Sequence, residues 1–284
     1  MTLTTPPLLL AIEAEFPELV GLARTTVRLH PRRGEPGADE SSMGGPLLWP
    51  VEEPWPVCSA TDEHDKPVPM VSVLQVFARD VPELPFPAGT DVFQLLWCPT
   101  LHELYRPEPL FRWRSAASVR ERSPGLPAPE PDGWVYDDFL PRPCVLNPER
   151  VREFPGELEL DDDLVERVDA WAEPQGWHYS SHLGAAPGTK AGGWAQWHNG
   201  PFYPECVCGT PMTHLLSIAS WEHDALSWRR WVPLEETGAD RPHGAYPDAS
   251  LAQEPSGVIV GRTGVMYLLT CTVCAHRPIV MDIQ

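Results

Sequence analysis

GTKAGGWAQWHNGPFYPECVCGTPM, Gly188 to Met212, is the stretch that decides the fold, because the chain carries a second version of it. The earlier version starts with MGGPLLWP at Met43 to Pro50 and continues through Pro-x-Cys to Pro-Met. Three pairs of matching residues lie 148 positions apart and two lie 142 apart: Gly44 and Gly192, Trp49 and Trp197, Cys58 and Cys206, then Met70 and Met212, Leu74 and Leu216. One internal duplication, with six extra residues between cysteine and methionine in the first copy, explains both offsets.

The segments after the two copies read as matching strands. An apolar run follows each Pro-Met, VSVLQV in one half and THLLSI in the other. Each half then has a second apolar run that ends in cysteine, FQLLWC at 93–98 and MYLLTC at 266–271. The sequence therefore predicts an α+β fold of two related β-rich halves.

Three regions are expected along the chain. The N-terminal half covers 1–143 with its repeat core at 42–100, and the C-terminal half covers 178–284. Between them, 144–177 is predicted to be a helical connector. Its helix is DDDLVERVDAW, capped by Asp161 and acidic in its first turn.

Two further elements are predicted before the first repeat. Residues 8–23 have apolar spacing typical of a helix, which Pro17 bends or divides. Thr25 to His30 alternates like a strand. The 284 residues include 35 prolines, far above the usual share of about 5%. We therefore expect few helices and many proline-rich loops, around a core filled by 12 tryptophans and other apolar residues.

The formal net charge of −19 bears on partners. Such a surface repels nucleic acid and anionic membranes and suits a basic protein partner, although it also serves solubility alone. The opening MTLTTPPLLLAIEAEF has no basic segment before its short apolar run, so it does not read as a signal peptide. No run is long enough for a membrane span. Together with an odd number of cysteines, seven, these features predict a cytoplasmic protein with reduced thiols.

The strongest chemical signal is Cys206-x-Cys208 with Cys271-x-x-Cys274. Two close pairs of cysteines are typical of a structural zinc site, and residues i and i+2 of an extended chain face the same way. Gly209 permits the tight turn that such a site requires. Reduced buried thiols and a redox pair are the alternatives. Four sulfur ligands would leave no open position for catalysis.

The first half keeps Cys58 and Cys98, with His64 and His102 nearby. These four residues are one candidate for a second metal site of two cysteines and two histidines. The irregular spacing favours the other interpretation, in which the first half is degenerate and its two cysteines pack as small hydrophobic side chains.

Other candidate binding residues are aromatic or histidine. Trp49, Trp194 and Trp197 could stack on a ligand, but we expect them to fill the core. His178 and His182 would share one face of a helix and could hold a metal, although nearby glycine and proline disfavour that helix. The glycine pairs beside the tryptophans lack any phosphate-loop pattern and are expected to form tight turns.

The motif combination resembles a known family. The pattern of a Gly-Gly pair, tryptophan, Pro-x-Cys and Pro-Met, carried by TKAGGWAQWHNGPFYPECVCGTPMTHLLSIASWEHD and by SSMGGPLLWPVEEPWPVC, is similar to the YwqG-like family of bacterial proteins (domain of unknown function 1963). The tryptophan content looks like that of the actinobacterial branch. The same pattern is distantly similar to the programmed cell death protein 2 family. That resemblance implies a chaperone for a ribosomal protein, and some bacterial relatives are thought to be toxin-immunity proteins.

Three functions follow as hypotheses. The first is a protein-binding module, chaperone-like or immunity-like, with a structural zinc site and a basic partner. The second is an enzyme with a site between the halves, under a lid at 243–257; its residues to test are His178, His182, His198 and Glu205. The third is a purely structural or regulatory zinc protein. No catalytic motif is recognised, so the balance is against an enzyme.

Overall fold

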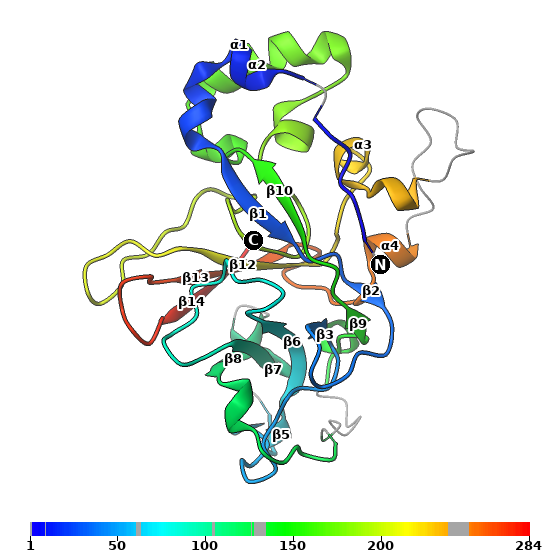
Figure 1. Cartoon of the computed structure of the whole chain (residues 1–284), viewed down its shortest axis with the longest axis vertical. Coiled ribbons are helices and arrows are strands. Elements are labelled where there is room, and N and C mark those ends of the chain that lie inside the picture. Colours follow the sequence, from blue (N-terminus) through cyan, green and yellow to red (C-terminus); the bar gives the residue numbers. More distant parts are fainter. Residues whose placement is uncertain are drawn as a thin grey trace.

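The computed structural model describes residues 2–8, 10–60, 64–103, 106–125, 127, 135–237 and 250–284. Two antiparallel six-stranded sheets form its centre, and the α1 and α2 helices lie together at one end (Figure 1). The helices are few and short. This is the β-rich α+β fold that the sequence predicts.

The first sheet holds the later copy of the repeat. Its strands, in spatial order, are β10 (Glu149–Glu153), β1 (Arg24–Arg28), β11 (Lys190–Gly192), β12 (Thr213–Ala219), β13 (Val265–Thr270) and β14 (Ile279–Ile283). The β12 and β13 strands are buried along almost their whole length, because both faces of the sheet are covered there. Their continuous apolar sequences, rather than alternating ones, follow from this double burial.

The second sheet holds the earlier copy. Its strands, in spatial order, are β2 (Arg32–Arg33), β9 (Cys144–Val145), β3 (Ser42–Met43), β6 (Val71–Phe77), β7 (Val92–His102) and β8 (Arg106–Arg114). A separate hairpin is formed by β4 (Val57–Cys58) and β5 (Val68–Pro69). It lies between the glycine turn and the β6 strand, where the sequence has its six extra residues.

The two sheets exchange their outer strands. β1 and β2 follow one another in the chain, yet β1 pairs with β11 in the first sheet and β2 pairs with β9 in the second. In the same way β9 and β10 lie in different sheets. The strands of each sheet therefore come from both sides of the expected boundaries at residues 143 and 178. The region 144–177 is also not only helical, because it opens with β9 and β10.

The strand registers agree with the sequence offsets. Leu74 pairs with Leu95 in the second sheet, and Leu216 pairs with Leu268 in the first. Both pairings follow a register shift at the same position of the strand, between Ser72 and Leu74 and between His214 and Leu216. The β3 and β11 strands pair with their neighbours in the same corresponding way. The internal duplication itself stays a prediction, and we use these correspondences below only as geometry.

One hydrophobic core lies between the sheets. Its largest side chains come from both, with Phe93 and Trp97 on β7 and Met266 and Leu268 on β13. Two smaller apolar clusters lie at the cysteine-bearing ends of the sheets, one around Trp49 and the other around Trp197. A fourth joins the helices at one end.

The helices confirm part of the sequence analysis and correct another part. Asp161 accepts a hydrogen bond from the backbone N–H of Asp163, at 3.0 Å, and caps α2 (Asp162–Ala172) as predicted. The region 8–23 is not one long helix. It holds the single-turn α1 (Ile12–Glu15) and a 3-10 helix over Pro17–Leu22, because the proline cannot continue the α-helix. Two more short helices, α3 (Trp228–Trp231) and α4 (Ser250–Gln253), follow β12.

Both glycine pairs form tight turns. Gly44 and Gly192 have positive φ angles of 64° and 65°, as the sequence suggests. The turn after β11 is fixed by a buried carboxylate, since Glu153 accepts hydrogen bonds from the backbone N–H groups of Ala186 and Trp194, at 2.7 and 2.6 Å. The same carboxylate forms a buried ion pair with Lys190, at 2.9 Å.

Candidate metal centres

The four cysteines expected to bind zinc lie together at one corner of the first sheet. Cys271 directly follows β13, and Cys274 lies three residues later in the turn that leads to β14. Cys206 and Cys208 lie in the tight turn before β12. The pairing of β12 with β13 brings the two turns together across the 65 residues that separate Cys206 from Cys271 in sequence.

The sulfur atoms have the spacing of a tetrahedral site. Cys206 Sγ lies 3.7 Å from Cys274 Sγ, and Cys208 Sγ lies 3.6 Å from Cys271 Sγ. All four sulfurs lie within 4.8 Å of one another. A tetrahedral zinc ion with Zn–S bonds of about 2.3 Å holds its sulfurs about 3.8 Å apart. The same distances are far too long for a disulfide, and all four cysteines are free.

Backbone hydrogen bonds hold both turns in shape. Gly209 has a φ angle of 80° and donates its N–H to the carbonyl of Cys206, at 2.8 Å. The N–H of Cys206 donates to the carbonyl of Thr210, at 2.9 Å. In the other turn the N–H of Cys274 donates to Cys271 Sγ, at 3.4 Å.

The electrostatics also favour a cation at this cluster. Hydrogen bonding with Thr210 lowers the pKa of Cys208 to about 6, so this sulfur is readily a thiolate. The neighbouring sulfurs of Cys208 and Cys206 raise the pKa of Cys274 to about 12, because a second negative charge beside the first is unfavourable. A divalent cation would remove that conflict. Four sulfur ligands favour zinc and other thiophilic metals over magnesium and calcium.

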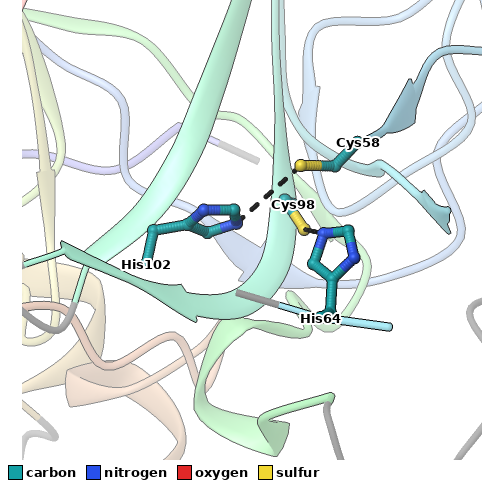
Figure 2. Close-up of side chains that lie close together, drawn as sticks. All are labelled: Cys58, His64, Cys98 and His102. Atoms are coloured by element: carbon teal, nitrogen blue, oxygen red, sulfur yellow. Dashed lines mark hydrogen bonds between the residues drawn. The ribbon is translucent and has the colours of Figure 1, made fainter. Parts of the chain in front are cut away.

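The first half has a second cluster at its own sheet corner, which the sequence analysis treats as the less favoured alternative. Figure 2 shows the side chains of Cys58, His64, Cys98 and His102 directed toward one another. Their ligand atoms lie within 4.8 Å of one another. Cys58 and Cys98 are buried in an apolar cluster, as the packing interpretation expects, but each sulfur also has an imidazole nitrogen within 4 Å, so both interpretations stay open. We call these four residues the Cys-His cluster.

The tryptophans proposed as ligand platforms lie mostly inside. Trp49 is 1% exposed and packs on Trp55, and Trp197 is 5% exposed and packs on Tyr267. Trp194 is partly exposed; its indole N–H donates to the carbonyl of Leu22 at 2.8 Å. Trp49 and Trp197 thus fill the core, as the packing alternative expects, whereas Trp194 does not.

The histidines proposed as a metal pair contact each other, and His178 Nδ1 also lies 3.8 Å from a carboxylate oxygen of Glu173. His178 lies just before a π-helical turn over Tyr179–Leu183 that contains His182, and its backbone N–H donates to His182 Nδ1 at 3.0 Å. That bond occupies the nitrogen of His182 nearest to His178. Among the described residues, the clusters able to supply three or more metal ligands do not include either histidine.

The residues suggested for an enzyme do not share one site. His198 lines a small pocket of about 60 Å³ with Trp221, and its Nδ1 lies 3.2 Å from the hydroxyl of Tyr267. Glu205 instead lies exposed beside the cysteine turn, and the histidines at 178 and 182 do not line that pocket. Of the expected lid at 243–257, residues 243–249 lie outside the described chain. The remainder includes α4 and is hydrogen-bonded to the protein, since Gln253 accepts from the backbone N–H of Glu222 at 2.9 Å.

The sequence analysis missed two threonines that contact the cysteine clusters. The hydroxyl of Thr210 lies 3.4 Å from Cys208 Sγ, and the hydroxyl of Thr100 lies 3.1 Å from Cys98 Sγ. In both cases the threonine follows the cysteine by two residues. Both halves therefore contain a Cys-x-Thr pattern, which could have identified the two threonines from the sequence.

No protein-family model matches this chain, and no curated protein of similar sequence is found. Membership of the YwqG-like family therefore stays a prediction. In the described part of the chain, no helix combines the length and apolar character that crossing a membrane requires.

Proposed function

We propose that this chain is a cytoplasmic protein-binding module, stabilised by structural zinc at Cys206, Cys208, Cys271 and Cys274, whose partner is a basic protein. The location of the negative charge is the observation that supports a basic partner. Residues 10–23 and 157–175, which contain α1, the 3-10 helix and α2, hold eleven acidic residues and one basic residue. We call this helical end of the molecule the acidic cap (Figure 1).

Eight of the eleven acidic residues of the acidic cap are exposed to solvent. Its single basic residue, Arg167, is already paired with Glu18 and Asp163, at 3.1 and 3.0 Å. The exposed acidic residues are Glu15, Glu18, Glu157, Asp161, Asp162, Asp163, Glu166 and Glu173. A compact negative surface of this kind attracts a basic partner and accelerates its association, more than it raises affinity at equilibrium.

The zinc in this proposal has a structural role. All four coordination positions would be filled by cysteine sulfur, which leaves none for a substrate or a catalytic water. The ion would join the turn before β12 to the turn after β13. Each turn also presents an apolar side chain to solvent at its tip, Val207 and Val273, which are 99% and 66% exposed. These tips offer a second, apolar contact region to a protein partner.

The family resemblance supports the same class of function. Programmed cell death protein 2 relatives are expected to act as chaperones of a ribosomal protein, and ribosomal proteins are typically basic. An immunity protein would likewise use an acidic surface against a basic toxin. Both versions predict one basic partner and a strong dependence of binding on salt.

A capture experiment with a matched pair of variants tests the proposal. The full chain, loaded with zinc, serves as bait in lysate of its own host at about 0.1 M and about 1 M salt, where the screening length falls from about 10 to about 3 Å. The cap variant combines Glu15→Gln, Glu157→Gln and Glu166→Gln; all three are exposed. The control neutralises three exposed glutamates outside the cap: Glu35, Glu52 and Glu121.

We expect wild type and the control to enrich the same basic protein at low salt. The cap variant should lose most of it, because its charge is changed by the same amount but at the proposed surface. Enrichment of no basic protein by wild type would reject the proposal. Equal loss in the cap variant and the control would show that total charge, rather than the acidic cap, governs the interaction.

A further inference from the structure

We infer that the Cys-His cluster is a second metal site, distinct from the four-cysteine cluster, and that its ligand chemistry selects zinc. Cys98 Sγ lies 3.8 Å from His64 Nε2, and Cys58 Sγ lies 3.9 Å from His102 Nε2 (Figure 2). In a tetrahedral site with Zn–S of about 2.3 Å and Zn–N of about 2.0–2.1 Å, sulfur and nitrogen ligands lie about 3.6 Å apart. The two pairs match that separation to within a few tenths of an ångström.

The burial of the cluster needs an explanation that packing alone does not give. His64 is 2% exposed, yet its Nδ1 has no hydrogen-bond partner among the described residues, and its Nε2 is directed at Cys98. A buried imidazole whose nitrogens lack good partners is costly to desolvate. A metal ion bound at Nε2 would replace the long contact with the Cys98 sulfur by a coordination bond shared with that sulfur, and would keep the ring where it already lies.

The cluster also occupies the same position in its sheet as the four-cysteine cluster. Cys58 belongs to the β4–β5 hairpin as Cys206 belongs to the turn before β12. Cys98 lies on β7, and the corresponding Cys271 directly follows β13. The hydrogen bonds that close the two turns correspond as well: Met70 N–H to Pro56 O at 3.0 Å, and Met212 N–H to Pro204 O at 2.9 Å.

In each half the metal ligands form two pairs along the chain, and the second residue of each pair is histidine in the first half but cysteine in the second. In the first half His64 follows Cys58 by six residues and His102 follows Cys98 by four, whereas the corresponding spacings in the second half are two and three. His64 lies between Cys58 and Met70, in the segment that is six residues longer than its counterpart in the second half. The longer loop thus delivers a ligand to the same corner from a different position in sequence.

Thr100 has a supporting place in this site. Its hydroxyl lies 3.1 Å from Cys98 Sγ and 3.0 Å from His102 Nε2. With metal on the imidazole nitrogen, the hydroxyl would donate to the Cys98 thiolate alone. Such a donor stabilises the charged sulfur and orients it, as outer contacts of metal ligands commonly do.

The ligand set specifies the metal. Two thiolates and two imidazoles form a closed tetrahedral set suited to zinc, whereas magnesium and calcium require oxygen ligands. Binding converts each cysteine thiol to thiolate and releases those protons to solvent. The bound ion would tie the β4–β5 hairpin, which belongs to neither six-stranded sheet, to the end of β7.

Zinc content of the intact chain, measured by native mass spectrometry on protein purified in reductant without chelator, tests the inference. Wild type should carry two zinc ions. Cys58→Ser with His102→Ala should carry one, and Cys206→Ser with Cys271→Ser should also carry one. Cys144→Ala is the matched control, because Cys144 is equally buried but belongs to neither cluster, and it should keep two.

A ligand exchange covers the case in which a double variant does not fold. His64→Cys replaces one nitrogen ligand by sulfur and should keep two metals. With cobalt(II) in place of zinc, its sulfur-to-metal charge-transfer absorption should exceed that of wild type, whereas a merely structural histidine would leave that absorption unchanged. Two results would overturn the inference: wild type that binds no zinc, or wild type that binds one zinc and loses it in the Cys206→Ser, Cys271→Ser variant. In the second case, zinc binding at the four-cysteine cluster would still stand.

Discussion

A buried histidine on β12 should make the fold sensitive to mild acid. His214 Nδ1 donates to the carbonyl of Gly192, and Nε2 accepts from the hydroxyl of Ser217, both at 2.8 Å. This arrangement uses both nitrogens of a neutral imidazole. Burial, assisted by the positive charge of Lys190, lowers the pKa of His214 to about 3.

The sign and size of the effect follow from the difference between folded and unfolded chains. The unfolded histidine has a pKa of about 6.5, so below that pH the unfolded chain binds a proton that the folded chain does not. The free energy of unfolding therefore falls as the pH falls from about 6.5 toward 3. Between about pH 7 and about pH 5, His214 alone should remove about 2 kcal/mol.

The assay is urea unfolding of wild type and His214→Gln at both pH values. Between about pH 7 and about pH 5, the free energy of unfolding of the variant should fall by about 2 kcal/mol less than that of wild type. The comparison subtracts any loss of zinc from cysteine ligands in acid, because both proteins share it. His178→Gln is the control for replacing a histidine elsewhere in the chain, since that side chain is 52% exposed. An equal loss in His214→Gln and wild type would refute the reasoning.

Three further changes should alter the free energy of unfolding, again measured in urea. Gly193→Ala should destabilise more than Gly89→Ala: both have positive φ, but the new Cβ would clash with Glu153 Oε1, whereas nothing lies within 4 Å of a Cβ at Gly89. Lys190→Met should cost about 3–5 kcal/mol by leaving the Glu153 carboxylate buried without its counterion, and adding Glu153→Gln should recover part of this. Asp161→Ala should cost about 1 kcal/mol as the α2 cap is lost; an unchanged midpoint would contradict that role.

The offsets in the sequence agree with the pairing of the central strands of the two sheets. The offsets of 148 and 142 residues align Met43 with Ala191 and Leu74 with Leu216, and both pairs of strands adopt the same register. The helix after Asp161 was also predictable, because its cap and its apolar face are local signals. Each of these predictions depends on neighbouring residues or on a simple repeat.

The exchange of outer strands was not predictable in the same way. β1 and β2 are separated by only Leu29, His30 and Pro31, and no local property of this segment shows that the chain passes from one sheet to the other. The Cys-His cluster was only partly visible, since the spacings to His64 and His102 do not match those of the other half. Such sites are formed by tertiary contacts, which propensity and periodicity do not encode.

The two corner clusters also explain how the tryptophans of the repeat are used. Trp49 packs beside Cys58 and Cys98, and Trp197 packs beside Cys206 and Cys271, each in a small apolar cluster separate from the main core. A metal crosslink at each corner would add to this packing and to the backbone hydrogen bonds of the turns, and the tryptophan would shield the sulfurs from water. The change of ligands between the halves then alters the chemistry of the corner while preserving its mechanical role.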